Sequence, residues 1–360
     1  MRTSRFIGLL AVMVLSASIF LITSAPVHAA TAEDTTLNLI TSPLPIDLKA
    51  TPGSTVSTEI RIKNGSPHSE TLKVRLMKFS AFGEEGKPSI QDRGPGDTYF
   101  DWVNFSSERF VAPSNKWVTI KMSITVPKDA AFGYYYAAVF SRADTPKPAT
   151  SRQNVLVGST AVLVLVDVDV PGAKRTAEIK SFTVNKHTFE FLPADFAIKI
   201  RNTGNVHLVP TGNIFIKRGN KTVATLNVNS PGGNVLPASN RIFTASWTDG
   251  FPVYTPKEAG GQVVLDKNDK PVTELKADFT KVSKLRIGRY TAHVLLAYDN
   301  GKSDVPLEAT VSFWVIPWRL ILIAIAIPVV PAVAVYLFTN WRFKRRLARE
   351  RATKKSRIEQ

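Results

Sequence analysis

The residue types that could carry out chemistry are few and widely spaced in this chain of 360 residues. Cysteine is absent, which excludes disulfides, thiolate zinc sites, iron–sulfur clusters and cysteine nucleophiles. The nucleophile-elbow, zincin, P-loop and dinucleotide-binding motifs are absent as well. The histidines are too scattered to predict a metal site: they are His28, His68, His187, His207 and His293. We therefore expect no enzyme, no resident metal and no cofactor.

Two acidic stretches resemble functional sites but fit them poorly. Asp266, Asn268 and Asp269 look like a fragment of a calcium loop, although the glycine and the bidentate glutamate of such a loop are misplaced. We expect a solvated turn at that point. Glu84 and Glu85 lie in polar loop sequence, where we expect both carboxylates to be hydrated.

Aromatic side chains in two long polar segments are the best candidates for a binding surface. The first group is Tyr99, Phe100 and Trp102, and the second is Phe251 and Tyr254. Such rings stack on sugars or anchor a protein partner. The first group has a second interpretation, because rings at this place in a β-sandwich also cap its core.

Period-two alternation of apolar and polar residues dominates the chain between residues 30 and 316. Residues 56–62 and 118–126 alternate regularly, and the second run stops at Pro127. Residues 161–166 are all apolar, which predicts a strand that is covered on both faces. A long 3.6-residue period is absent, which disfavours folds that need crossover helices. The pattern predicts an all-β protein made of immunoglobulin-like antiparallel β-sandwiches.

An internal repeat predicts two such sandwiches in tandem. Residues 60–64 (IRIKN) match residues 198–202 (IKIRN), and G-x-Y-x-A-x-V occurs at both 133–139 and 288–294. Residues 113–116 and 237–241 supply a third landmark in the same order. We place the first sandwich at 30–172 and the second at 173–316, with Pro171-Gly172 at the boundary. Extra chain lies around residues 80–101 in the first copy and 248–285 in the second, and long insertions of this kind are often functional.

The two ends of the chain are hydrophobic and predict export and anchoring. Residues 1–29 carry Arg2 and Arg5 before an apolar stretch, as in a secretory signal peptide, with an uncleaved anchor as the alternative. Residues 320–338 hold no charge, which predicts a transmembrane helix over 317–341 rather than a buried soluble helix. Trp314, Trp318 and Trp341 flank this stretch, as interfacial aromatics do.

A basic tail follows the apolar stretch and predicts the orientation of the protein. Residues 342–360 hold nine Lys or Arg against two Glu, within a chain of formal charge +17. The first of these, Arg342, Lys344, Arg345 and Arg346, complete the predicted anchor. By the positive-inside rule the C-terminus is cytoplasmic and the sandwiches lie outside the cell, as in a single-pass type I protein. The tail could also bind anionic lipid headgroups. The tail is short and has no folded basic surface beside it, so it does not predict nucleic-acid binding.

The layout resembles the WxL-interacting surface proteins of Gram-positive bacteria. The likeness is most specific in the first sandwich, over residues 46–53 (IDLKATPG), 101–105 (DWVNF), 126–130 (VPKDA) and 133–140 (GYYYAAVF). It covers residues 35–170, and the second sandwich is similar by layout. The resemblance implies a first domain that binds peptidoglycan and a second that binds a partner protein.

Taken together, these features predict a membrane-anchored, non-enzymatic cell-surface protein. Its ectodomain would bind a cell-wall polymer, such as peptidoglycan, or a surface protein. The alternative is an accessory or scaffold subunit of an envelope complex, whose contacts are made by the helix and the tail.

Overall fold

The computed structural model describes residues 37–144 and 158–358, so the predicted signal peptide lies outside the described residues. The first sandwich packs a sheet ordered β1-β3-β8-β6 against one ordered β2-β10-β9-β4-β5, with β7 also paired to β4. Its elements are β1 (Leu39–Ser42), β2 (Ile46–Ala50), β3 (Thr55–Asn64), β4 (Glu70–Phe82), β5 (Lys87–Gln91), the 3-10 helix η1 (Thr98–Trp102), β6 (Val103–Phe105), β7 (Arg109–Ala112), β8 (Trp117–Thr125), β9 (Phe132–Arg142) and β10 (Ser159–Val168).

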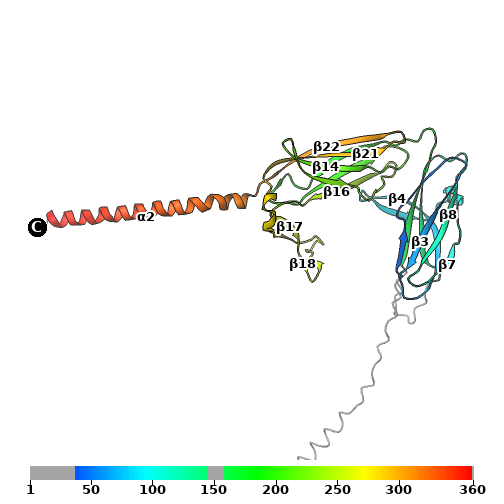
Figure 1. Ribbon diagram of the computed structural model, residues 1–360, viewed down its shortest axis with the longest axis horizontal. Helices are drawn as coiled ribbons and strands as arrows, with labels where there is room; N and C mark the ends of the chain where they lie inside the picture. Colours follow the sequence, from blue (N-terminus) through cyan, green and yellow to red (C-terminus); the bar gives the residue numbers. More distant parts are fainter. Residues whose placement is uncertain (1–36, 145–157, 359–360) are drawn as a thin grey trace, which may run out of the picture.

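The second sandwich repeats this plan with sheets ordered β11-β13-β16 and β12-β22-β21-β14-β15. Its strands are β11 (Ala177–Val184), β12 (Thr188–Phe189), β13 (Ala194–Asn202), β14 (Thr211–Arg218), β15 (Lys221–Val228), β16 (Asn240–Trp247), β21 (Gly288–Asp299) and β22 (Asp304–Val315). The two sandwiches meet at an angle, and the tip of β4 projects toward the second one (Figure 1).

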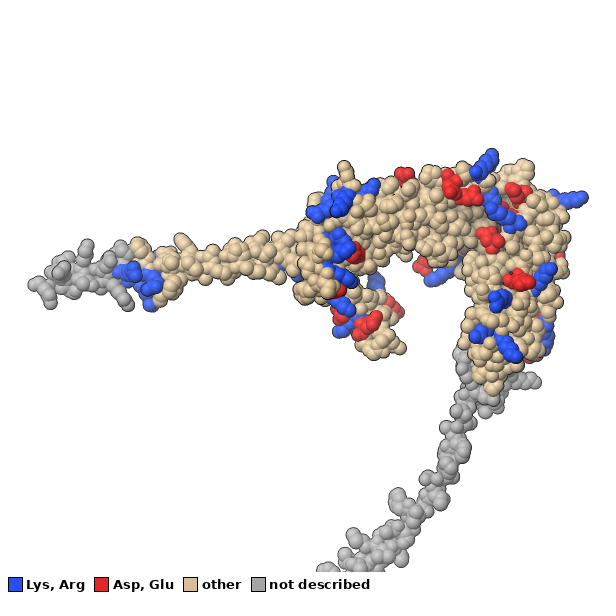
Figure 2. Space-filling view, in the orientation of Figure 1, with Lys and Arg blue, Asp and Glu red and all other residues tan. Residues whose placement is uncertain are grey.

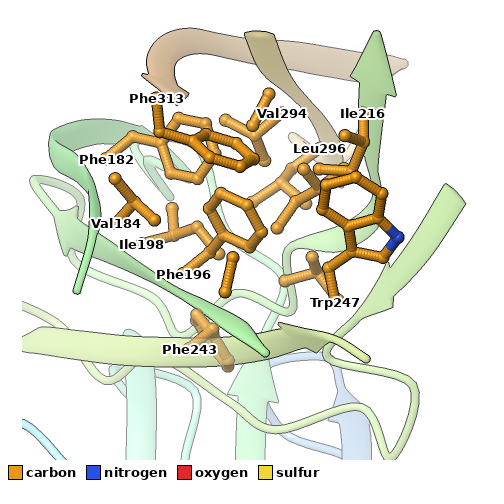
Figure 3. Close-up of a cluster of buried hydrophobic side chains, with 14 of the residues drawn as sticks. Phe182, Val184, Phe196, Ile198, Ile216, Phe243, Trp247, Val294, Leu296 and Phe313 are labelled. Atoms are coloured by element: carbon orange, nitrogen blue, oxygen red, sulfur yellow. The ribbon is translucent and has the colours of Figure 1, made fainter. Parts of the chain in front are cut away.

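The sandwich class predicted from the alternation is confirmed, and each sandwich has its own apolar core. In the second core Phe196, Trp247 and Phe313 converge from different strands (Figure 3), and each is at most 1% exposed. Each larger sheet also contains one parallel pair, β10 with β2 and β22 with β12. The alternation pattern did not reveal these pairs, because period two is the same for either strand direction.

The internal repeat corresponds to equivalent strand ends, and each is closed by a buried asparagine. The Asn64 amide donates to the carbonyls of His68 and Ala112, and its Oδ1 accepts from the Ser66 N–H. The Asn202 amide donates to the carbonyls of Val206 and Val235, and its Oδ1 accepts from the Gly204 N–H. These contacts make Ala112 equivalent to Val235, so the 113–116 landmark matches 236–239, one residue earlier than the sequence comparison placed it.

The insertion at 248–285 forms two small hairpins and a short helix beside the second sandwich. They are β17 (Val253–Pro256) with β20 (Thr273–Lys276), β18 (Glu258–Ala259) with β19 (Gln262–Val263), and the 3-10 helix η2 (Phe279–Lys284). The insertion, in yellow, lies at the end of the second sandwich from which the C-terminal helix leaves (Figure 1).

The C-terminal helix α2 (Trp318–Ile358) is long enough and apolar enough over Trp318–Arg346 to cross a membrane. Pro328 and Pro331 lie inside it, and the helix continues into the basic tail, beyond the predicted end at residue 341. Basic residues are good helix formers, so the tail extends the helix instead of ending it. The whole apolar window is exposed within the protein, which excludes the alternative of a buried soluble helix.

The asparagine at the end of β13 allows a first test of the repeat. Asn202→Ala leaves two carbonyls of fully buried residues without a donor, and each buried unpaired group costs about 1–3 kcal/mol. We expect the free energy of unfolding of the second sandwich to fall by about 3 kcal/mol. Asn64→Ala costs the first sandwich less, because His68 is exposed and water replaces the lost donor. Calorimetric unfolding of the solubilised protein measures both, with the exposed Asn104→Ala as control. Equal, small losses in all three variants would contradict this account.

Candidate functional site

The outer face of the larger sheet of the first sandwich is apolar and forms the base of the contact between the sandwiches. Phe79 (β4), Ala137 (β9) and Leu165 (β10) are buried there, on the face opposite to the core of the first sandwich. Leu236, in the loop before β16, packs on them from the second sandwich. The prediction that the apolar run of β10 is covered on both faces is therefore met in part: Leu165 is buried on the outer face, with the second sandwich supplying part of the cover, whereas Ala161 and Leu163 on the same face are half-buried and line a pocket.

Glu84, at the tip of the β4–β5 hairpin, makes three hydrogen bonds across the contact. Its carboxylate accepts from Lys199 Nζ at 2.7 Å and from Asn240 Nδ2 at 3.0 Å, and its carbonyl accepts from the Ile242 N–H at 2.7 Å. The hydrogen bond from Lys199 is the main cause that lowers the pKa of Glu84, followed by the one from Asn240. The expectation that Glu84 is simply hydrated was wrong. We call these three contacts the Glu84 clasp.

Two further polar contacts flank the apolar base. His207 Nε2 of the second sandwich lies 3.1 and 3.2 Å from the carboxylate oxygens of Asp47 in β2. Arg175, in the connection between the sandwiches, forms an ion pair with the buried Asp167 in β10, and the Arg175 side chain is 13% exposed. These contacts lie at different places around the base and fix the angle between the two sandwiches.

A pocket of about 400 Å³ remains where the second sandwich does not cover the apolar base. The first sandwich contributes mainly apolar side chains together with Lys87, and the second contributes a loop and the cationic side chain of Arg241. The lining includes Leu44, Phe79, Ala81, Ile90, Leu163, Leu236 and Arg241. Leu44 and Ile90 remain exposed at its rim, so the pocket opens to solvent.

Two cationic residues line this pocket. Lys87 of the first sandwich pairs with Glu85, whereas the charge of Arg241, at the start of β16, is only partly compensated. Its guanidinium donates to the Asn234 carbonyl at 2.7 Å and lies over the Phe243 ring, 5.2 Å from the ring centroid. Burial lowers its pKa, and in the described part of the chain no carboxylate lies within ion-pair distance of it. The Asn234 Oδ1 nearby is buried and has no hydrogen-bond partner among the described residues. A group that is apolar along its length and acidic at one point would satisfy this site.

The predicted aromatic group at Tyr99, Phe100 and Trp102 packs on the core of the first sandwich. Phe100 is buried, and Tyr99 and Trp102 are half-buried against Tyr134 and Tyr136 of β9, with ring centroids 4.6–5.7 Å apart for the close pairs. Burial raises the pKa of Tyr99 to about 12. These contacts match the second interpretation of the sequence, in which the rings cap the core. A binding role for them stays a prediction.

The second predicted group is also packed, at the base of the insertion. Phe251 contacts Phe279 with ring centroids 5.6 Å apart, and Tyr254 lies 6.2 Å from Phe191. Asp266 accepts hydrogen bonds from the N–H groups of Asn268 and Lys270, so the apparent calcium fragment is a turn closed by its own backbone. No group of three His, Asp or Glu side chains suited to a metal occurs in the described parts of the chain.

The predicted anchor residues lie at both ends of the apolar window of α2. Trp314 and Trp318 are exposed beside its start. At the other end, the Arg345 guanidinium lies 3.8 Å from the Trp341 ring centroid, and Arg342 lies over Phe338. Lys344 and Arg346 are exposed on the same stretch of helix.

Comparisons with known proteins give only distant likenesses. No family model matches the chain, and no curated protein matches it. Among solved structures, the class 5 fimbriae chaperone CfaA is 15% identical, with 76% of this chain and 98% of that chain covered and a TM-score of 0.35. The E. coli chaperone DraB is 9% identical, with 76% of this chain and 98% of that chain covered and a TM-score of 0.31. The Pseudomonas aeruginosa CupB2 chaperone is 10% identical, with 77% and 100% covered and a TM-score of 0.32.

At these scores the likeness carries no argument about function. The described residues define a protein of two immunoglobulin-like β-sandwiches with one C-terminal helix that is able to span a membrane. The resemblance to WxL-interacting surface proteins stays a prediction.

Sequence reasoning missed Glu84 and Arg241 as site residues. The partners of Glu84 lie far away along the chain, at residues 199, 240 and 242. Arg241 contacts the nearby Asn234 and Phe243, but the apolar base beside it belongs to the first sandwich. The one available signal was the extra chain around residues 80–101, which carries Glu84.

The Glu84 clasp predicts a matched pair of variants. Glu84→Ala removes two of its three contacts across the sandwiches, whereas the neighbouring Glu85 pairs only with Lys87 within the same hairpin. We expect Glu84→Ala to broaden the distance distribution between spin labels on the two sandwiches, and Glu85→Ala to leave it unchanged. Because the chain has no cysteine, one labelling cysteine can be introduced into each sandwich without removing any native one. An equal effect of the two variants would argue against the clasp.

The same clasp predicts a dependence on pH. The pKa of Glu84 is lowered below its ordinary value of 4.5, so the contribution of its carboxylate is complete at neutral pH and is lost as the pH falls through the folded-state pKa. We expect the distance distribution to hold between pH 7 and 5 and to broaden only at lower pH. Glu84→Gln should remove this transition, and a transition that persists in Glu84→Gln would assign it to another group.

Proposed function

We propose that this chain is a membrane-anchored, non-enzymatic binding protein of the cell surface, and that it holds a segment of a partner protein in the pocket between its sandwiches. The observation that carries the proposal is the composition of the pocket. An apolar base lies next to Arg241, a partly buried cation without a carboxylate partner among the described residues. Burying such a charge costs free energy, and an acidic group of a ligand offsets that cost.

The chemistry of the lining favours a polypeptide over a wall polymer. Sugar rings bind best on exposed aromatic faces with several polar groups around them. Here the pocket lining is mainly aliphatic, and the predicted aromatic group at residues 99–102 packs on the core. A polypeptide segment with aliphatic and acidic side chains matches both parts of the pocket. Binding to peptidoglycan, as the family resemblance implies, remains the alternative for other surfaces of the ectodomain.

The anchor and its orientation support the assignment to the cell surface. The apolar window of α2 is exposed and is followed by a dense run of basic residues. By the positive-inside rule these residues stay in the cytoplasm and the sandwiches lie outside. An accessory subunit of an envelope complex is the second reading of the same layout. Replacing α2 with an unrelated anchor separates the two, because a surface-binding module keeps its partner and such a subunit loses it.

Photo-crosslinking from within the pocket tests the proposal. A photoreactive amino acid at Ala81, which lines the pocket, should give adducts with a protein in intact cells. The matched control is Val111, which is 59% exposed on β7, at the far end of the same sheet face from the pocket rim on β4. Adducts at Ala81 should decrease strongly with Ile90→Asp and with Arg241→Gln, whereas Val111→Asp should leave them unchanged.

Two outcomes would overturn the proposal. Adducts of equal yield from Ala81 and Val111 would mean random collision and not a site. Adducts of Ala81 with wall polymer would assign the pocket to the carbohydrate alternative, and retention of residues 30–316 on purified wall would then be expected as well.

A further inference from the structure

A second exposed apolar surface lies where the second sandwich meets the transmembrane helix. We call it the membrane-proximal face. Its residues come from η2, from the segment that follows η2, from the end of β22 and from the junction into α2: they are Phe279, Val282, Ile287, Trp314, Ile316 and Trp318. Phe279 is 77% exposed, Val282 and Trp318 are 50% exposed, and Trp314 is 47% exposed. Large side chains exposed together in this way mark an interaction surface.

The membrane-proximal face is formed jointly by the insertion and by the junction between β22 and α2. Only Ile316 and Pro317 separate β22 from α2. The Trp314 and Ile316 N–H groups donate to the carbonyls of His187 and Phe189, so this junction is held against the sandwich. On the insertion side, the Phe251 N–H donates to the Lys284 carbonyl, and Phe251 and Val315 border the same small void.

The short helix η2 is fixed so that its apolar side chains stay exposed. Phe279 and Val282 lie on either side of a kink at Lys281, and both side chains are at least half exposed. The Asp278 carboxylate caps the start of η2 by accepting from the Thr280 N–H. Asp249 then holds the end, because it accepts from Lys284 at 3.0 Å and from Arg286 at 2.8 Å.

Basic residues accompany the apolar ones. Residues 278–289 hold two lysines and two arginines against one aspartate. Lys281 pairs with Asp278, and Lys284 and Arg286 share Asp249, so the cations still exceed these carboxylates by two. Figure 2 shows Lys and Arg side chains gathered at this end of the second sandwich, next to the start of α2. Apolar side chains with neighbouring cations are the composition that binds the interface of a bilayer containing anionic lipids.

We propose that the membrane-proximal face docks on the outer leaflet of the bilayer that α2 crosses, with Phe279 and Val282 inserted among the headgroups. This inference rests on the proposed anchoring of α2. The occupant is the lipid surface because the face continues directly into the segment that must enter it. Docking adds a second point of attachment to the helix and holds the second sandwich at one tilt to the membrane.

Single-cysteine labelling in lipid nanodiscs tests the docking, since the full chain has no cysteine of its own. An environment-sensitive fluorophore is placed at Phe279 or Val282, and quenchers are carried by lipids near the headgroups. We expect blue-shifted emission and strong quenching at both positions. Leu265 is the matched control, because it is also exposed (52%) and apolar but lies between the small strands of the insertion. Its label should remain in water.

Further variants separate docking from anchoring. A label at Ile325 inside α2 reports the anchor itself, so quenching at 325 without quenching at 279 overturns the docking and leaves the anchoring intact. Absence of quenching at 325 would remove both. Phe279→Asp should lower the quenching at Val282, whereas Leu265→Asp should not change it. Shielding of the label at 279 in native membranes but not in nanodiscs of pure lipid would assign the face to a protein partner and overturn the proposal.

Discussion

The arrangement of the two sandwiches depends on one constraint: the larger sheet of the first sandwich is apolar on both faces. In β10, Val164 and Val166 fill the core, while Leu165 between them points to the opposite side. Burying a side chain of this size stabilises a protein by about 1.5–3 kcal/mol, so the outer face has to be covered. The second sandwich covers part of it through Leu236, and the uncovered part is the pocket.

The polar contacts around this base determine the angle more than the strength of the association. The side chains of Glu84 and Lys199 are each about one-third exposed, and ion pairs of that kind contribute little net free energy. Their geometry is nevertheless specific, because the same glutamate also accepts the Ile242 N–H of the edge strand β16. Apolar burial thus holds the sandwiches together, whereas hydrogen bonds select one orientation among the many that burial alone permits.

Patterns within short stretches of sequence predicted the strands and the repeat, which depend on neighbouring residues. Alternation gave the strands, and the pentapeptides ending at Asn64 and Asn202 gave the repeat, because an asparagine that closes a strand end needs the same neighbours each time. The apolar run at 161–166 predicted a strand covered on both faces, yet it could not reveal the cover, since a pattern along one strand does not identify its partner. Glu84 was misjudged for the same reason: its surroundings in sequence are polar, but its partners are more than 100 residues away.

The short junction between β22 and α2 gives the pocket a defined place relative to the bilayer. A flexible tether of many residues would let the sandwiches sample a wide range of positions. Two residues, with backbone hydrogen bonds on either side of Val315, allow much less freedom. The contact between the sandwiches transmits this restriction to the first sandwich, because its angle is fixed by contacts from three separate loops and strands. If α2 crosses a bilayer and the pocket holds a partner segment, as proposed, that segment would be bound at one height above the membrane.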